Sequence, residues 1–207
     1  NYTPYLGADH KSKILPTIET MKDKIETSQS SVSEVVDLLD DQKIVAVYGG
    51  GSESGRRALG NRSILADPRS KKMKDIINEK VKHRQWFRPF APSILRSEVS
   101  KWFEREEDSP YMSFVIKFKE EVRDKVPAVV HFDGSARLQT VTKNDNEWYF
   151  DLLTKWHEKS GVPVLLNTSF NDREPICETP EHAISCFLGT EIDYLYFYDL
   201  DLLVRRK

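Results

Sequence analysis

The stretch of sequence that is most informative about the fold runs from Ile44 to Ser63 and reads IVAVYGGGSESGRRALGNRS. Its first part, Ile44–Tyr48, is entirely apolar or aromatic and predicts a buried strand. The residues that follow, 49–63, contain five glycines and three arginines. Glycine allows unusual backbone angles and close approach of a ligand, so this pattern indicates a sheet strand that runs into a functional loop.

Strands and helices are predicted on both sides of this stretch. Ser31 and Glu34 have the spacing of a capping box and predict a helix start, and the apolar spacing over 70–81 predicts an amphipathic helix. Further strands are predicted at 111–118, 128–132, 138–142, 163–166, 194–198 and 201–204, and further helices from about 144 to 161 and from 179 to 189. Because the two types are mixed without strict alternation, we expect an α/β or α+β fold around one mixed sheet.

Residues 1–30 differ in composition from the rest of the chain. They have few periodic apolar positions and contain the turn formers Pro4, Gly7 and Pro16. We therefore predict a linker or arm over residues 1–30 and one folded domain over residues 31–207. Since the sequence begins at Asn1 rather than at a methionine, we expect it to be part of a longer polypeptide with a further domain.

Composition excludes several classes of protein. The 31 basic and 33 acidic residues give a formal charge of −2, so there is no global attraction to nucleic acid or to a membrane surface. No apolar run approaches the ~20 residues that span a bilayer, and we expect a soluble, cytoplasmic protein. The two cysteines, Cys177 and Cys186, match no CxxC motif, and the five histidines have no metal-ligand spacing. We therefore predict no disulfide and no protein-bound transition metal.

The arginines suggest an anion site. Seven of the thirteen arginines lie between Arg56 and Arg96, and the glycine-rich loop contains arginine but no lysine. Guanidinium groups bind two phosphate oxygens at once, and glycines expose backbone N–H groups to a ligand. The loop has neither the P-loop pattern nor the GxGxxG pattern. A surface loop with solvated arginines explains its composition equally well.

Three further segments carry candidate ligand-binding residues, and each has an ordinary structural explanation. Lys82 ends a predicted helix, where lysines are usually solvated, whereas Arg88 lies between two phenylalanines in a segment that two prolines hold extended. Arg137 follows Asp133 and Gly134, which alone would indicate a simple turn. Asn167 and Ser169 leave the end of a predicted strand, a common place for ligand contacts and also for turns.

Taken together, four blocks of sequence resemble one family. They are GGSESGRRALGNRSILADPR (50–69), KHRQWFRPFAPSIL (82–95), DGSARLQTV (133–141) and GVPVLLNTSFN (161–171). In this order they resemble the carboxy-terminal domain of the O-carbamoyltransferase family that includes nodulation and antibiotic-tailoring enzymes. The resemblance covers residues 44–204.

This resemblance implies a YrdC-like α/β fold, with a twisted mixed sheet, flanking helices and a basic cavity. In such enzymes the domain uses carbamoyl phosphate and ATP, which brings Mg²⁺ with it, to form carbamoyl adenylate. An amino-terminal domain of the actin and sugar-kinase type then transfers the carbamoyl group to a hydroxyl. Tyr5-Leu6-Gly7 resembles the segment that connects the two domains.

The resemblance also assigns roles to individual residues. It implies substrate and nucleotide binding by Arg57, Lys82, Arg88, Arg137, Asn167 and Ser169, of which Lys82, Arg88 and Arg137 would also be catalytic. Two features depart from the family pattern: Gly51 and Arg56 stand where arginine and proline are common, and the segment 171–174 is shortened. Two alternatives to an enzyme domain are an RNA-binding YrdC-like module and a regulatory nucleotide-binding domain. The acidic net charge argues against RNA.

Overall fold

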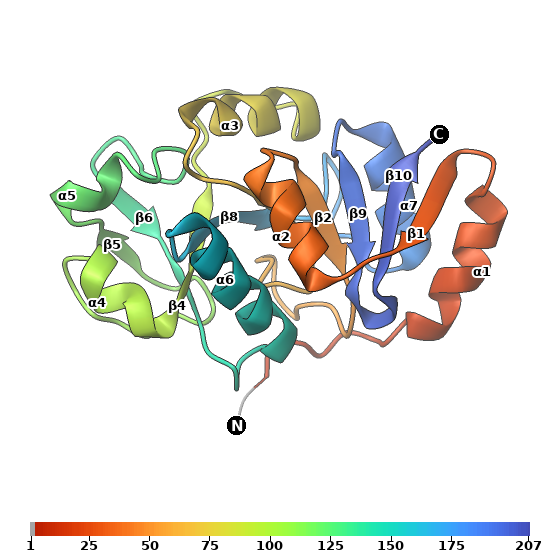
Figure 1. Cartoon of the computed structure of the whole chain (residues 1–207), viewed down its shortest axis with the longest axis horizontal. Helices are drawn as coiled ribbons and strands as arrows, with labels where there is room; N and C mark the ends of the chain where they lie inside the picture. The colour runs from red at the N-terminus through yellow and green to blue at the C-terminus, as the bar shows by residue number, and fades with distance from the viewer. Residues whose placement is uncertain (1–2) are drawn as a thin grey trace.

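A central sheet of eight strands organises the chain in the computed structural model, which describes residues 3–207. The strands of this sheet are β1 (Ile25–Gln29), β2 (Val45–Tyr48), β3 (Arg62–Ala66), β4 (Ala91–Leu95), β7 (Gln139–Val141), β8 (Val164–Ser169), β9 (Tyr194–Phe197) and β10 (Leu202–Arg206). Their order is β1-β10-β9-β2-β3-β8-β4-β7 (Figure 1). The pairs β2–β9 and β4–β7 are parallel and the other pairs are antiparallel, so the predicted mixed sheet is confirmed.

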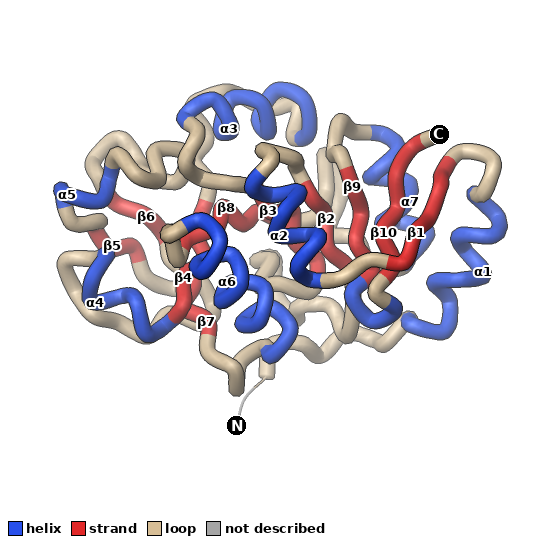
Figure 2. Tube along the Cα trace, viewed as in Figure 1, coloured by secondary structure: helices blue, strands red, loops and turns tan. Residues whose placement is uncertain are grey.

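Helices and a small second sheet complete the fold. The helices are α1 (Lys11–Met21), α2 (Val32–Asp40), α3 (Lys71–Ile76), α4 (Val99–Trp102), α5 (Glu120–Arg123), α6 (Glu147–Ser160) and α7 (Pro180–Gly189). A π-helical turn, Ile77–Val81, continues α3, and β5 (Val115–Lys117) pairs with β6 (Ser135–Arg137). Two 3₁₀ turns lie at Arg96–Glu98 and Tyr198–Leu200. Figure 2 shows the helices distributed around the red strands of the central sheet.

Each face of the sheet buries a separate apolar layer. Val45 and Val47 of β2 pack in the layer that includes residues of α2 and α6, which lie together on one face (Figure 1). Ala46 and Tyr48 point to the other face, into the layer that includes residues of α1 and α7. This alternation explains why the strand is apolar at every position: both faces are covered.

The predicted arm over residues 1–30 is corrected by the structure. Residues 11–21 form α1, and Ile25–Gln29 form the edge strand β1, which pairs with β10 from Ile25 opposite Arg206 to Gln29 opposite Leu202. Burial of Ile14 and Ile25 anchors both elements in the core. Residues 3–10 of the arm form no helix or strand, and Asn1 and Tyr2 lie outside the described residues. Whether this segment connects to another domain stays a prediction.

Most local predictions agree with the structure, with three exceptions. Ser31 and Thr179 cap α2 and α7, and Gly161 ends α6 in the left-handed region with a φ of 73°. The start of α6 is predicted at about residue 144, but Asn146 caps this helix and Glu147 is its first residue. The strand predicted at 128–132 is wrong, because these residues form turns and Phe132 is fully exposed. The strand predicted at 111–118 is reduced to β5.

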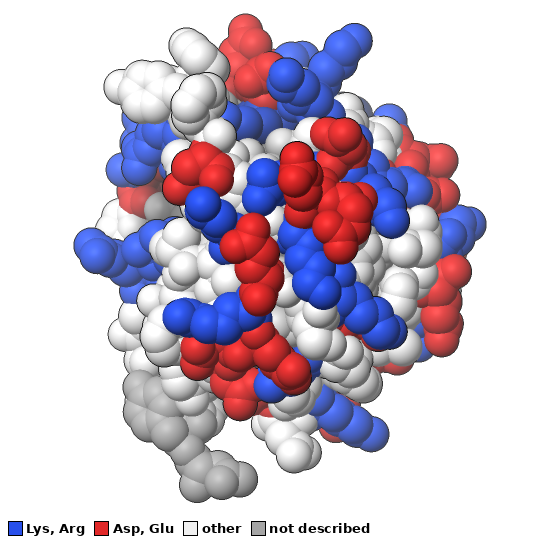
Figure 3. All heavy atoms as spheres, turned by 90° about the vertical axis from the view of Figure 1, so that its left-hand side faces the viewer, with Lys and Arg blue, Asp and Glu red and all other residues white. Residues whose placement is uncertain are grey.

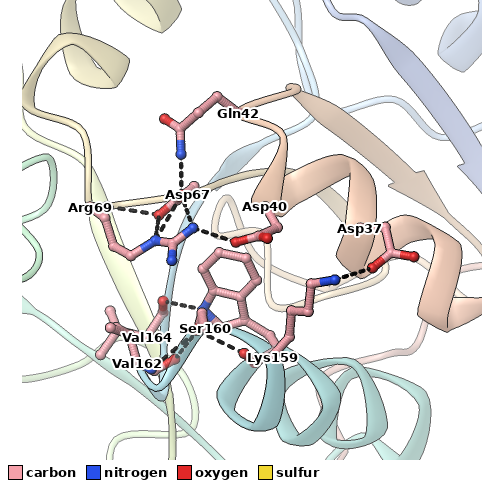
Figure 4. A network of polar contacts seen from close by, with 10 residues as sticks. Asp37, Asp40, Gln42, Asp67, Arg69, Lys159, Ser160, Val162 and Val164 are labelled. Atoms are coloured by element: carbon pink, nitrogen blue, oxygen red, sulfur yellow. Dashed lines mark hydrogen bonds and ion pairs between the residues drawn. The ribbon is translucent and has the colours of Figure 1, made fainter.

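A partly buried ionic network connects α2, the segment that follows β3, and α6. Arg69 donates to Asp67 and, at 2.6 Å, to Asp40, while Gln42 also donates to the Asp67 carboxylate (Figure 4). Asp67 is fully buried. The Arg69 guanidinium lies 5.1 Å from the ring centroid of Trp156 on α6. This network explains the charged residues of the ADPR sequence at 66–69 without a ligand.

Charges elsewhere on the surface are mixed. Figure 3 views the end of the molecule that carries α4 and α5, and shows basic and acidic side chains interspersed there. None of the helices within residues 3–207 is long and apolar enough to cross a membrane.

Candidate functional site

Five arginines from three separate segments line one cavity of about 300 Å³. We call it the arginine cavity. Its basic residues are Arg56, Arg57, Arg84, Arg88 and Arg137, and its lining also includes Asn167, Thr168 and Ser169 at the end of β8. The site therefore lies where the glycine loop, the segment before β4 and the end of β6 meet β8.

The positive charge of this cavity is not neutralised by the chain. Within residues 3–207, no ion pair joins any of the five arginines to a carboxylate. Burial, together with the charges of Arg57 and Arg56, lowers the pKa of Arg137, and burial beside Arg88 lowers the pKa of Arg84 to about 10. Such concentrated like charge favours binding of a multivalent anion, which would offset the repulsion.

A buried carboxylate holds the glycine loop closed. Glu53 Oε1 accepts hydrogen bonds from the backbone N–H groups of Leu59, at 2.8 Å, and Asn61, at 2.9 Å. Burial raises the pKa of Glu53, and its second oxygen has no hydrogen-bond partner among the described residues. The segment between Glu53 and Leu59 carries Arg56 and Arg57, so this carboxylate determines where the loop returns to the sheet.

The third arginine of the loop has a structural role. Arg62 is fully buried and donates to the carbonyl oxygens of Gly49, at 2.6 Å, and Gly50, at 3.1 Å. Its guanidinium lies 3.7 Å from the ring centroid of Tyr48. Arg62 therefore fixes the glycine turn at the end of β2 and does not contribute to the cavity.

The π-helical turn positions the arginines before β4. Asn78, which is fully buried, accepts a 2.7 Å hydrogen bond from Arg84 Nε and donates to the carbonyl oxygen of Arg88 at 3.0 Å. Single π-helical turns place an extra residue in a helix and are frequent at functional sites. Here the turn brings one amide side chain into contact with both arginine-bearing residues.

Lys82 lies beside the arginine cavity but does not line it. Its side chain is buried, and its ammonium donates to the carbonyl oxygen of Ser169 at 2.5 Å and to Asn171 Oδ1 at 2.8 Å. Burial, together with the charge of Arg84, lowers the pKa of Lys82 to about 7. Since Ser169 lines the cavity, the ammonium of Lys82 lies next to the cavity lining, at the end of β8.

Asn167 forms the polar floor of the cavity. Its Nδ2 donates to Ala58 O at 3.1 Å, Ser93 Oγ at 3.0 Å and Gln139 Oε1 at 2.9 Å. Gln139 in turn donates to the carbonyl oxygen of Leu59 at 2.9 Å. The Oδ1 atom of Asn167 is buried and has no partner among the described residues. It leaves one acceptor for an amide or ammonium group of a ligand.

The structure thus brings together most residues that the sequence indicated. Arg57, Arg88, Arg137, Asn167 and Ser169 line one cavity, and Lys82 contacts Ser169. Sequence reasoning missed three contributors: Glu53, Asn78 and Gln139. It included Arg84 in the candidate segment 82–88 without giving it a role of its own. The sequence does carry a signal for Asn78, because this polar residue directly follows Ile77 within the apolar pattern of 73–81.

A larger cavity, of about 640 Å³, is lined by residues of the segment 171–178 and of α7. Its lining mixes Asp172, Glu174 and Glu178 with Arg173 and His182. Because its charged groups are of both signs, it lacks the concentrated charge of the arginine cavity.

Comparison with known proteins finds relatives that match most of this chain. The family model "Carbamoyltransferase C-terminus" matches residues 36–205. Nodulation protein NolNO of Sinorhizobium fredii is 43% identical over 176 residues, and the uncharacterized protein MJ1058 of Methanocaldococcus jannaschii is 46% identical over 165 residues. These matches cover 83% and 79% of this chain but only 26% and 27% of the relatives, so the chain spans about a quarter of their length.

Solved structures share the fold at low sequence identity. HypF of T. kodakarensis matches with a TM-score of 0.59 and 17% identity, covering 89% of this chain and 23% of that one. A variant of P. abyssi Sua5 matches with a TM-score of 0.51 and 16% identity, covering 76% of this chain and 43% of that one. The predicted YrdC-like arrangement, a mixed sheet with flanking helices, is thereby confirmed.

Proposed function

Because this chain belongs to the carbamoyltransferase C-terminus family, we propose that it is the domain that binds carbamoyl phosphate and ATP and forms carbamoyl adenylate. The observation that carries the proposal is the arginine cavity, with five guanidinium groups and no carboxylate partner within residues 3–207. The two substrates together carry about six negative charges, and five arginines with one Mg²⁺ ion are of that order. The Mg²⁺ would arrive with ATP and bind mainly to its phosphates.

In the proposed reaction, carbamoyl phosphate reacts with water to give carbamate and phosphate. A carbamate oxygen then attacks the α-phosphorus of ATP, a new oxygen–phosphorus bond forms, and pyrophosphate leaves with the electron pair of the broken bond. The arginines would bind the phosphate groups and stabilise both leaving groups. No side chain needs to act as a nucleophile, because holding the two substrates in line accelerates such a step.

Each predicted site residue has a place in this proposal. Arg57, Arg88 and Arg137 would contact phosphate oxygens directly, as guanidinium groups do in two-point contacts. Asn167 would accept a hydrogen bond from the carbamoyl amide through its unpartnered Oδ1, and Ser169 would bind a phosphate or ribose oxygen. Lys82 would add charge from behind Ser169.

The remaining three quarters of the relatives' length suggests a division of labour. We propose that an amino-terminal domain of the actin and sugar-kinase type, in the same polypeptide, transfers the carbamoyl group to a hydroxyl. The isolated chain should therefore make the adenylate and carbamoylate no acceptor. The use of ATP would place the reaction in the cytoplasm.

A direct assay tests the proposal. The purified chain is given ATP, Mg²⁺ and carbamoyl phosphate, and pyrophosphate release and carbamoyl adenylate are measured by a coupled assay and by mass spectrometry. Release of pyrophosphate that requires carbamoyl phosphate supports the proposal. A folded chain that binds neither substrate would contradict it, and salt-dependent binding of RNA in place of both substrates would favour an RNA-binding module. ATP binding without pyrophosphate release, even with the missing domain supplied, would favour a regulatory role.

A further inference from the structure

The segment Pro4–Gly7, which we call the strap, is paired with the glycine loop through its backbone. Gly7 N donates to Ser52 O at 3.0 Å, and Ser54 N donates to Pro4 O at 2.7 Å. The two bonds run in opposite directions, as in a short piece of sheet. The strap therefore holds the part of the loop that precedes the arginines.

The strap also holds the part of the loop that follows the arginines. Tyr5 donates from its hydroxyl to the carbonyl oxygen of Leu59 at 3.0 Å. Burial raises the pKa of Tyr5 above its ordinary value, so this hydroxyl stays protonated and remains a donor. Glu53 also binds Leu59, because it accepts a hydrogen bond from the N–H of this residue. The strap and the Glu53 carboxylate therefore bind the carbonyl and the N–H of the same residue.

Arg56 and Arg57 lie between these two attachments. A Cβ atom built on Gly55 would meet no atom within 4 Å, so packing does not hold the loop at that position. Arg56 is exposed as well. The positions of both guanidinium groups in the cavity thus depend on the fixed ends of a short, open segment.

Strap and loop approach each other so closely that glycine is required on both sides. A Cβ atom on Gly7 would lie 1.9 Å from Ser52 Oγ and 2.6 Å from Ser52 N. A Cβ atom on Gly51 would lie 2.6 Å from Gly7 O. Neither glycine has a positive φ, so the reason is contact between the two backbones rather than an unusual backbone angle. Gly51, which departs from the family pattern, therefore has a local explanation in this chain.

We propose that Tyr5 and Gly7 are positioning residues for Arg56 and Arg57, and that the strap sets the geometry of the phosphate-binding loop. This inference rests on the proposed function, because it takes carbamoyl phosphate and ATP as the anions that bind to the arginine cavity. If an amino-terminal domain precedes the strap in the full polypeptide, its movements would reach both arginines through Tyr5 and Gly7.

Three variants of the whole chain test the proposal. Gly7→Ala introduces the clash with Ser52, Tyr5→Phe removes one hydrogen bond, and Leu6→Ala is the matched control because Leu6 is 64% exposed. Calorimetry with carbamoyl phosphate and with MgATP gives affinities. Limited trypsin digestion without ligand, followed by mass spectrometry, gives the rate of cleavage after Arg56 and Arg57 relative to other sites.

We expect Tyr5→Phe to weaken binding about fivefold, as loss of one hydrogen bond does, and Gly7→Ala to weaken it by more than about tenfold. Both variants should speed cleavage at the two arginines selectively, whereas Leu6→Ala should change neither quantity. A change in stability without selective cleavage would indicate a merely structural role and overturn the proposal.

The experiment still gives a decision if one variant or one ligand titration fails. If Gly7→Ala does not fold, Tyr5→Phe decides: unchanged affinity and unchanged cleavage at Arg56 and Arg57 would overturn the proposal. If the wild-type chain binds neither ligand, the proposed function fails. The digestion still tests whether the strap orders the loop, because it needs no ligand.

Discussion

The ammonium of Lys82 donates a 2.5 Å hydrogen bond to the carbonyl oxygen of Ser169, the last residue of β8. Two oxygens of Asn171 accept from the same ammonium, both at 2.8 Å. An ammonium has three donors, so the chain itself occupies them. Lys82 therefore supports the segment that carries Ser169 and supplies charge close to the cavity.

Lys82→Met should weaken carbamoyl phosphate and ATP binding and slow pyrophosphate release, because it removes the charge and frees the end of β8 while nearly conserving volume. A pyrophosphate assay and calorimetry measure both effects. Lys80→Met is the matched control, because Lys80 lies on the same turn but is exposed and pairs with Glu191. Formation of the adenylate at the wild-type rate by Lys82→Met would show that Lys82 has no role.

The low pKa of Lys82 predicts a pH dependence of anion binding. Burial lowers this pKa to about 7, so the side chain is charged below pH 7 and loses its proton as the pH rises through 7. Sulfate, which does not titrate in this range, should therefore bind more weakly at pH 8 than at pH 6. Titration calorimetry at several pH values tests this, and the step near pH 7 should disappear in Lys82→Met. A step of the same size in that variant would assign the effect to another group.

Arg137→Ala should weaken binding of carbamoyl phosphate or ATP without unfolding the chain. A charge-assisted phosphate contact contributes ~1.5–3 kcal/mol, which corresponds to roughly ten- to hundredfold in affinity. Removal of one of several repelling guanidinium groups should leave the folded state at least as stable. Arg105→Ala is the control, because Arg105 is exposed and lies outside the cavity. Unchanged calorimetric affinity for both ligands would remove Arg137 from the site.

Local sequence signals predicted the elements that depend on local chemistry. The caps Ser31 and Thr179 and the terminator Gly161 act within a few residues, so their positions follow from the sequence. Strand β1 could not be predicted in this way. Its sequence, Ile25–Gln29, has one buried residue followed by four exposed ones, and it is a strand because it pairs with β10.

The sequence predicted the charged residues of the site. It did not predict the hydrogen bonds that hold the cavity together. Arginines that cluster along the chain are visible in the sequence, and Arg57 and Arg137 do share one cavity. The supports act across long separations: Asn167 donates to Gln139, and Gln139 donates to Leu59. Nothing in the sequence alone connects these three positions, since the contacts exist only once β8 and β7 flank β4.

Asp67→Ala should destabilise the chain by about 3 kcal/mol, because it leaves Arg69 and Gln42 without their shared buried carboxylate. Urea unfolding measures this. Asp37→Ala, which removes an exposed ion pair with Lys159, is the control and should cost less than about 1 kcal/mol. Where folded, the Asp67 variant should bind ATP normally, since Asp67 does not line the arginine cavity. Equal losses of stability in both variants would contradict this account of the network.

Asn167→Asp should remove hydrogen bonds that hold the floor of the cavity and should add a negative charge beside the arginines. The substitution replaces Nδ2, which donates to Ala58 O and Gln139 Oε1, by an oxygen that cannot donate to either. Gln139 cannot simply turn its amide round, because its own Nε2 already donates to Leu59 O.

Two effects of this substitution can be separated by comparison with Asn167→Ala. Loss of the buried donor should cost about 2 kcal/mol of unfolding free energy in either variant. Only the aspartate places a negative charge among the arginines, so it should weaken MgATP binding at least about tenfold more than the alanine. Urea unfolding and calorimetry measure the two quantities, and Asn144→Asp, which adds the same charge at an exposed position, is the control. If the aspartate and alanine variants bind MgATP equally, the phosphates do not lie near Asn167, and its place in the proposed site is wrong.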